Sequence, residues 1–123
     1  MLFRSRGKRL HPATRVFQAL RMAVNDELGA LGCGLEAALK ILKPRGRLAV
    51  ITFHSGEVRL VKEFGREFSR DYALPGEVDV PELRRPVAAK LKWVQRKAVW
   101  PGADELAANP RARSAQLRVF EKI

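Results

Sequence analysis

One stretch decides the fold, and it runs from a helix breaker through a strand into a turn: Lys43-Pro44-Arg45-Gly46-Arg47-Leu48-Ala49-Val50-Ile51-Thr52-Phe53-His54-Ser55-Gly56-Glu57. Its centre, residues 47–53, is an almost continuous apolar run rich in branched side chains, which is typical of a buried central strand in a parallel sheet. After the turn, apolar residues recur every three or four positions up to Phe68, which predicts a helix. The order helix, strand, helix indicates an α/β fold.

Upstream of this stretch, apolar residues recur with a helical period from Phe17 to Leu42. The pattern is long enough that Asn25, or the glycines just after it, is expected to divide it. We therefore predict one helix up to about Asn25 and another up to about Leu42. The tripeptide Gly32-Cys33-Gly34 follows no strand and lies inside the apolar period, so we interpret it as helix surface or a hinge rather than a dinucleotide-binding loop.

Downstream, the sequence predicts an irregular connection and then more regular structure. Residues 71–86 are rich in proline, residues 91–97 alternate as a strand does, and a short helix is expected at about 104–108. A final strand, residues 115–121, is expected to pair antiparallel with the strand at 91–97 on the edge of the sheet. Along it, Leu117 and Val119 should face one side, and Gln116, Arg118 and Phe120 the other.

The composition points to a polyanionic partner. Lys and Arg number 24 against 13 Asp and Glu, a formal net charge of +11 in 123 residues. Such a chain binds nucleic acid with a strong dependence on salt. No apolar stretch is long enough for a membrane span, and residues 1–9 are basic without an apolar leader, so we expect a cytoplasmic protein with no membrane partner. One cysteine, Cys33, permits no intrachain disulfide, and we expect it to be a small packing residue; no metal-ligand spacing is present.

The turn after the first strand is one candidate site. In open α/β sheets ligands bind beyond the carboxyl ends of strands, which is where His54 and Ser55 lie. His54, Ser55 and Glu57 resemble the members of a nucleophilic triad, but a hydroxyl next to its base in sequence rarely has the geometry for proton transfer. We therefore favour substrate contact or turn capping.

The run from Asn109 to Arg118 is the second candidate site. In an extended segment, residues two apart point the same way, so Arg111 and Arg113 would form a clamp whose planar forks suit phosphate or a base edge. The alternative is a solvated basic turn. The sequence of this run leaves both interpretations open.

Three of these segments, in this order along the chain, resemble the bacterial MraW-type family, also called RsmH. They are residues 11–28, beginning His11-Pro12-Ala13-Thr14-Arg15, residues 42–55, and the arginine run at 109–118. Members of this family are S-adenosylmethionine-dependent enzymes that methylate the N4 of a cytosine in 16S ribosomal RNA. The resemblance covers nearly the whole chain but only the C-terminal part of the family's fold. It implies the C-terminal part of a Rossmann-like methyltransferase fold, with a helical N-terminal segment and a terminal antiparallel strand pair.

The resemblance also implies how the chain is divided and what it lacks. We expect a single truncated domain over residues 1–123, in which 1–28 end a helical inserted region and 29–123 form the C-terminal half of the methyltransferase sheet. The family's S-adenosylmethionine site and catalytic loop lie upstream of the matching region, so we expect no cofactor-binding, catalytic or metal-binding residue in this chain. Two departures stand out: the family pattern usually has Gly-Gly at Arg45-Gly46, and Leu-Glu-Asp-Arg at residues 56–59, where this chain has Val58 in place of the acid.

The residues that carry over from the family would contact RNA or support the structure. The RNA-binding set that we predict is Arg15, Arg21, Asn25, His54, Ser55, Arg59, Asn109, Arg111 and Arg113, with Glu27 beside it. The partner would be ribosomal RNA or the small ribosomal subunit. Two classes of function follow: one piece of a methyltransferase, active with a complementary N-terminal chain or as a homodimer, or a non-catalytic basic RNA-binding remnant.

Overall fold

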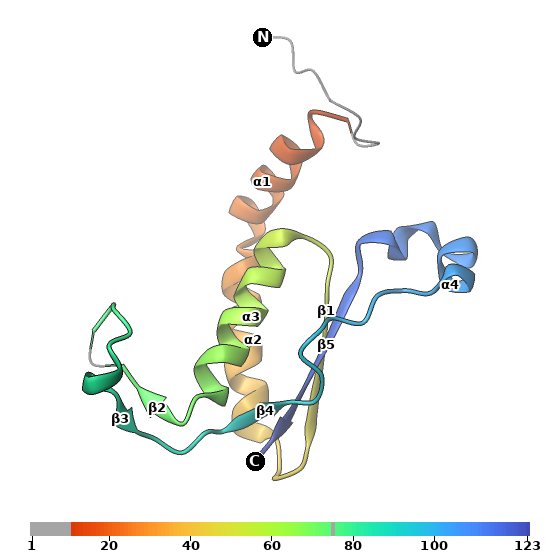
Figure 1. Ribbon diagram of the computed structural model, residues 1–123. Coiled ribbons are helices and arrows are strands. Elements are labelled where there is room, and N and C mark those ends of the chain that lie inside the picture. Colours follow the sequence, from red (N-terminus) through yellow and green to blue (C-terminus); the bar gives the residue numbers. More distant parts are fainter. Residues whose placement is uncertain (1–10, 75) are drawn as a thin grey trace.

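The computed structural model describes residues 11–74 and 76–123 (Figure 1). The basic segment on which the expectation of no leader rests lies outside the described residues. In chain order the elements are α1 (Thr14–Asn25), α2 (Glu27–Ile41), β1 (Arg47–Thr52), α3 (Ser55–Ser69), β2 (Tyr72–Ala73), the 3-10 helix η1 (Pro81–Leu83), β3 (Arg85–Pro86), β4 (Leu91–Trp93), α4 (Ala103–Ala108), the 3-10 helix η2 (Pro110–Ser114) and β5 (Gln116–Lys122).

The long helical pattern is divided where expected. Asp26 separates α1 from α2 with a φ of 48°, in the left-handed region that stops a regular helix. The segment Gly32-Cys33-Gly34 lies inside α2, as predicted. The expectation that Cys33 packs in the core is wrong, because the side chain is exposed. Leu35 and Leu39 define the buried side of α2, and a residue two positions before Leu35 points about 200° away from it.

The strand at residues 47–52 is present, but the one neighbour that the described residues give it is antiparallel, where a parallel neighbour was predicted. β1 pairs antiparallel with β5, and β5 pairs antiparallel with β4, in the order β1-β5-β4. Among the described residues β1 is thus an edge strand of an antiparallel sheet, not a central parallel strand. Its side chains alternate in exposure, with Thr52 buried and Ile51 60% exposed. An apolar run alone does not identify the strands that flank it, so the sequence did not indicate the antiparallel pairing with β5.

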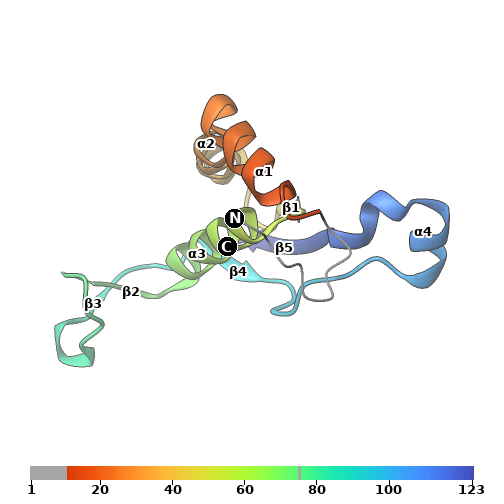
Figure 2. The same cartoon turned by 90° about the horizontal axis from the view of Figure 1, so that it is seen from above.

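One face of this sheet carries the core, and we call it the covered face. It presents Leu48, Val50 and Phe120 to α3, and α2 packs against α3 on the side away from β4 (Figure 2). Phe120 is fully buried between Phe64 of α3 and Trp93 of β4, with ring centroids 5.9 and 4.8 Å away. The close approach of α3 depends on Gly65, where an added Cβ would lie 2.5 Å from the Phe120 and Trp93 rings.

The opposite face of the sheet, which we call the open face, is only partly buried. It carries Ile51, Leu117 and Val119, and Val99 continues it through an isolated bridge to Leu117. The predicted division of the last strand into two sides is consistent with its burial, because Arg118 and Phe120 are buried together. At one end of the open face, Glu121 joins neighbouring strands by ion pairs to Arg47 at 3.2 Å and to Lys92 at 2.8 Å.

The remaining segments follow the predictions in part. Residues 71–86 are mostly irregular, as expected, although Tyr72–Ala73 and Arg85–Pro86 pair as two short strands. The predicted strand at 91–97 is regular only over Leu91–Trp93, while the helix expected at 104–108 is present as α4. In the turn before β1, Arg45 has a φ of 66°, a conformation that favours glycine. No helix in the described part of the chain is long and apolar enough to cross a membrane.

Candidate nucleic-acid interface

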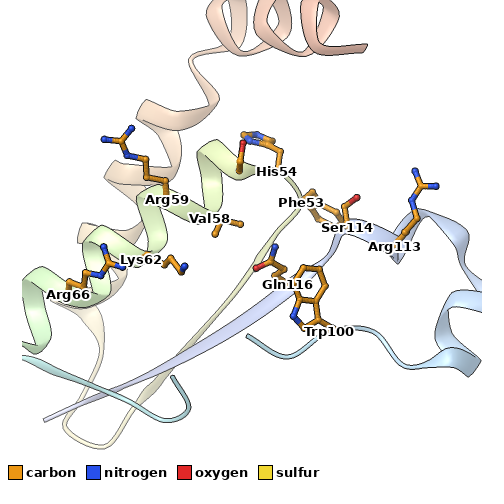
Figure 3. A pocket seen from close by; sticks show the side chains of 11 residues that line it. Phe53, His54, Val58, Arg59, Lys62, Arg66, Trp100, Arg113, Ser114 and Gln116 are labelled. Atoms are coloured by element: carbon orange, nitrogen blue, oxygen red, sulfur yellow. The ribbon is translucent and has the colours of Figure 1, made fainter. Parts of the chain in front are cut away.

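A cavity of about 580 Å³ opens where β1 ends and α3 begins, between these elements, η2 and the segment before α4 (Figure 3). We call it the basic cavity. Its lining residues are Phe53, His54, Ser55, Val58, Arg59, Lys62, Arg66, Trp100, Arg113, Ser114 and Gln116.

The turn at the edge of the basic cavity is fixed by reciprocal capping. His54 precedes α3 and its Nδ1 accepts a hydrogen bond from the Glu57 backbone N–H at 3.3 Å. The Glu57 carboxylate accepts in return from the Phe53 backbone N–H at 2.8 Å. This arrangement resembles a capping box, but a histidine replaces the usual hydroxyl and the carboxylate accepts from the residue before the N-cap. The first turn of α3, whose N–H groups and dipole favour anions, therefore has a fixed position at the cavity.

Cationic side chains surround the basic cavity from two sides. Arg59, Lys62 and Arg66 follow one another at spacings of three and four along α3, so they share one side of the helix. Arg113 reaches the cavity from η2 (Figure 3). Arg59 also pairs with Glu63 at 2.9 Å, and this hydrogen bond raises the pKa of the guanidinium. In the described part of the chain, Lys62, Arg66 and Arg113 make no ion pair, so three cations remain available to a ligand.

Two aromatic rings border the same space. Phe53 is 53% exposed and Trp100 is 58% exposed, and both line the cavity beside Gln116 (Figure 3). A partly exposed ring among cations gives a base a surface to stack on while its phosphates are neutralised. The combination is typical of a site for single-stranded nucleic acid.

The cavity brings together four of the predicted RNA-binding residues, His54, Ser55, Arg59 and Arg113. The other five lie elsewhere. Arg15, Arg21 and Asn25 are on α1, and Arg21 pairs with Glu27 at 3.1 Å. The Asn109 side chain accepts a hydrogen bond from the Arg111 backbone N–H and caps η2. The prediction for these five residues has no support from the geometry of the cavity.

The proposed clamp of Arg111 and Arg113 is not formed, because residues 110–114 are a 3-10 helix and not an extended segment. A 3-10 helix turns about 120° per residue, so side chains two apart point in different directions. Arg113 lines the cavity, while Arg111 is exposed and does not. Ala112 between them is buried, which fixes the side of the turn that faces the protein.

Lining residues that the sequence analysis missed include Lys62, Arg66, Trp100 and Gln116. The spacing of Arg59, Lys62 and Arg66 on a predicted helix was a usable signal, although a solvated helix face has the same pattern. Gln116 was correctly placed on the same face of its strand as Phe120. Nothing in the sequence indicates that Trp100 approaches the end of β1, because that contact depends on how the loop before α4 folds back.

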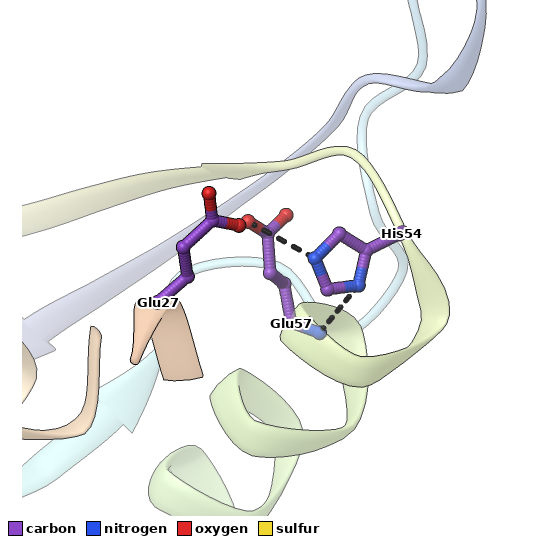
Figure 4. A group of neighbouring side chains, drawn as sticks. All are labelled: Glu27, His54 and Glu57. Carbon is purple, nitrogen blue, oxygen red and sulfur yellow. Dashed lines mark hydrogen bonds and ion pairs between the residues drawn. The ribbon is translucent and has the colours of Figure 1, made fainter. Parts of the chain in front are cut away.

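His54 and Glu57 also form a small cluster with Glu27 at the start of α2 (Figure 4). One ligand atom from each of the three lies within 4.8 Å of the others, which is compatible with a metal site. The His54 tautomer argues against one. Because Nδ1 accepts the Glu57 backbone N–H, the imidazole proton belongs on Nε2, which faces the Glu57 carboxylate at 3.4 Å. If a metal bound Nε2, the imidazole proton would have to move to Nδ1. Nδ1 could then no longer accept the Glu57 backbone N–H, and the helix cap would break. We therefore interpret the cluster as side chains that lie close together where the start of α2 meets the start of α3.

The triad of His54, Ser55 and Glu57 is likewise unsupported. His54 Nδ1 is engaged by the backbone of Glu57, and the described hydrogen bonds include none between His54 and Ser55. Of the two favoured interpretations, turn capping describes what His54 does in the structure, and substrate contact stays a prediction.

Two features of the described residues count against a site for S-adenosylmethionine. A cofactor cradle needs open space over a glycine after a strand. After β1 that position is Gly56, and an added Cβ there would meet the His54 ring at 3.3 Å, so the space is already filled. In the basic cavity, Arg59, Lys62 and Arg113 would attract the carboxylate of S-adenosylmethionine but repel its sulfonium and its ammonium. The cavity suits an anionic ligand.

Comparison with known proteins agrees with the family resemblance that the sequence indicates. A model of the MraW methylase family matches residues 2–123. A ribosomal RNA small subunit methyltransferase H from Methylobacterium sp. (strain 4-46) is 53% identical over 94% of this chain and 34% of its own length. The proteins of that name from Hyphomonas neptunium and Thermomicrobium roseum are 54% and 51% identical, over 92% and 97% of this chain. The chain spans about a third of the length of the curated relatives that it matches.

Proposed function

The chain belongs to the MraW methylase family, and from this premise we propose that it forms the RNA-facing part of an S-adenosylmethionine-dependent ribosomal RNA methyltransferase. The target would be the N4 of a cytosine in the small-subunit RNA. One observation carries the proposal: four cationic side chains and two aromatic rings line the basic cavity at the end of β1.

The chemistry of the reaction explains why such a cavity is useful. An exocyclic amine conjugated with a pyrimidine is a poor nucleophile, so methyl transfer depends on holding the amine in line with the methyl donor. The base must leave its stack at a cost of a few kcal/mol. Stacking on Trp100 or Phe53, with the flanking phosphates near Lys62 and Arg113, would offset that cost. His54 and Ser55 would contact the substrate at the strand end.

The methyl donor would be bound by polypeptide other than the described residues. The partly exposed apolar open face and the unpaired edge of β1 support this proposal, because both are surfaces that further polypeptide can cover. We propose that residues 29–123 are the C-terminal half of the methyltransferase sheet and residues 1–28 the end of a helical insertion. The covering polypeptide would be an N-terminal methyltransferase segment or a second copy of the chain.

Isothermal calorimetry tests the location of the cofactor site. The purified chain should show no measurable heat of S-adenosylmethionine binding, because Gly56 offers no open cradle and the cavity is cationic. Stoichiometric binding with micromolar affinity would contradict this assignment.

A matched pair of variants tests RNA binding in the basic cavity. Arg113→Ala and Arg111→Ala remove the same charge, one inside the cavity and one outside it. With a single-stranded RNA oligonucleotide, Arg113→Ala should weaken binding and reduce the slope of log affinity against log salt by about 0.7, the value of one lost phosphate contact. Arg111→Ala should change both quantities less. Equal effects would mean that the total charge of the chain, and not the cavity, binds RNA.

The alternative is a non-catalytic RNA-binding remnant, which would have the same cavity and the same salt dependence. Reconstitution separates the two functions. Mixing the chain with the cofactor-binding N-terminal segment of a relative should produce methylation of small-subunit RNA that neither polypeptide achieves alone. Failure of the mixture, with RNA binding intact, would favour the remnant.

A further inference from the structure

Arg118 is a cation buried on the covered face of β5. Its side chain is 5% exposed, and burial lowers the pKa of the guanidinium. Within the described residues its Nε and Nη1 have no hydrogen-bond partner and it makes no ion pair. Burying a charge without a counterion is costly, so a residue of this kind calls for a specific explanation.

The hydrogen bond that the Arg118 side chain makes within residues 11–74 and 76–123 points toward the basic cavity. Its Nη2 donates to Oε1 of Gln116 at 3.0 Å. Gln116 lies two positions earlier on the same face of β5 and lines the cavity, whereas Arg118 lies behind it. Arg118 is therefore buried, and its hydrogen bond holds Gln116, which a ligand in the cavity can reach.

This hydrogen bond fixes which way the Gln116 amide faces. A guanidinium has only donors, so it can face only the amide oxygen of Gln116. The amide NH₂ is then directed away from Arg118, and Gln116 is seen at the cavity between Trp100 and Ser114 (Figure 3). Without Arg118 the amide could turn over at little cost and present its oxygen instead. With it, the cavity has a neutral donor of fixed orientation beside Phe53 and Trp100.

We infer that Gln116 is the specificity-determining residue of the basic cavity, which binds a hydrogen-bond acceptor of the RNA, and that Arg118 is the positioning residue that holds its amide. This inference rests on the proposed function and deepens it. The acceptor could be a carbonyl oxygen or ring nitrogen of a base, or an oxygen of a phosphate. Cations such as Lys62 and Arg113 attract any phosphate, but a fixed neutral amide can distinguish an acceptor from a donor at one position.

The first experiment compares Gln116→Leu with Gln95→Leu, which removes an exposed glutamine outside the cavity lining. Affinity for the RNA oligonucleotide should fall roughly two- to tenfold in Gln116→Leu, the effect of one lost hydrogen bond, and stay at the parent value in Gln95→Leu. NMR titrations with cytidine and with inorganic phosphate then identify the source of the acceptor. Loss confined to cytidine assigns it to the base, and loss confined to phosphate assigns it to the backbone. Parent-like affinity of Gln116→Leu for all three probes overturns the inference.

The second experiment separates positioning from a general structural role. Arg118→Met removes a buried, unpaired charge, so the urea midpoint of unfolding should stay the same or rise. RNA affinity should nevertheless fall, by no more than in Gln116→Leu, and Arg118→Lys should recover part of it because an ammonium can still donate to Oε1. The double variant should bind no more weakly than Gln116→Leu alone. Additive losses in the double variant, or full affinity in Arg118→Met, overturn the role of Arg118.

The outcomes also distinguish this inference from the proposed function. If the parent chain binds no RNA, both fail. If the parent binds RNA and Arg113→Ala weakens it while Gln116→Leu does not, the proposed function stands and only the assignment of Gln116 and Arg118 fails. If Arg118→Met does not fold, the Gln116→Leu comparison and Arg118→Lys still decide the inference, because Arg118→Lys should bind RNA more tightly than Gln116→Leu.

Discussion

The covered and open faces of the sheet come from the same three strands but are stabilised in different ways. On the covered face, Phe120 and its neighbours are buried by helices of the chain itself. On the open face, Ile51 is 60% exposed and the strands are joined at one end by the charges of Arg47, Glu121 and Lys92. The covered face is thus buried by the chain itself, whereas the described residues leave the open face partly exposed.

This difference explains where a site can form. The basic cavity lies at the end of the covered face, where the position of α3 is fixed by close packing through Gly65 and by the cap at His54. This packing fixes the backbone of α3 and β5, the two elements from which Lys62 and Gln116 reach the cavity. A site on the open face would lack such support until another polypeptide covered it.

Truncating one large side chain on each face tests the comparison most severely. Phe120→Ala should lower the free energy of unfolding by about 3–5 kcal/mol, because it leaves a cavity between α3 and β4. Ile51→Ala, on the open face, should cost less than about 1 kcal/mol. Urea denaturation followed by circular dichroism measures both. Comparable losses would mean that the open face is already covered in solution, and the unfolding midpoint of the parent should then depend on protein concentration.

The fit of α3 on the covered face gives the second test. Gly65→Ala should destabilise the chain by about 1–3 kcal/mol, although alanine favours helices, because its Cβ would overlap the rings of Phe120 and Trp93. Gly34→Ala is the matched control in α2, where an added Cβ meets no described atom within 4 Å. It should stabilise by about 0.5–1 kcal/mol through helix propensity alone. If both variants gained stability, α3 would lie farther from the sheet than in this structure.

The sequence predicted most elements of the covered side, for physical reasons that are local. The division near Asn25, the strand at 47–52 and α3 each follow from periodicity and breakers within a few residues. The order of the strands in the sheet could not be predicted from the sequence. An apolar run such as residues 47–53 fits a central strand, and it fits equally well an edge strand with one exposed face. Pairing partners far apart in sequence leave no local signal.

The residues of the candidate site were likewise predictable only where a local sequence pattern indicates them. His54 and Ser55 were found because a strand end is a known position for ligands, and Arg113 because of a basic run. The clamp of Arg111 and Arg113 was wrong, since an extended segment was assumed where Pro110 starts a 3-10 helix, while RNA binding by Arg111 stays a prediction. Arg118 could not have been recognised, because its importance depends on burial, and nothing in a strand sequence distinguishes a buried arginine from an exposed one.

The turn that leads into β1 gives a third, smaller test, at the end of the sheet where the open edge begins. Arg45 has a φ of 66°, and its N–H donates to the Lys122 carbonyl at 2.8 Å. Arg45→Gly should raise the free energy of unfolding by roughly 0.5–1 kcal/mol, because glycine adopts this conformation without strain. Lys43→Gly is the control in the same turn, where φ is not positive, and it should be neutral or destabilising. A loss of stability in Arg45→Gly would show that the arginine side chain contributes more than the strained backbone costs.

The charges on the open face should produce the smallest effect, and pH reveals it. Hydrogen bonds from Lys92 and then Arg47 hold the pKa of the Glu121 carboxyl below its ordinary value of 4.5. A lowered pKa in the folded state means that the carboxylate stabilises the fold at neutral pH, and that this contribution is lost as pH falls through the folded pKa. Glu121→Gln should therefore be less stable than the parent at neutral pH and lose less stability on acidification. The Glu36→Gln control, on exposed α2 surface, should follow the parent curve.

High salt should bring the Glu121→Gln and parent curves together, since exposed ion pairs are screened. If the two curves stay parallel from neutral to acid pH at low salt, the row of charges does not hold the strands together. The strands at the open face would then be held together by the backbone pairing between β1 and β5 and not by these side chains. This result would strengthen the contrast between the two faces.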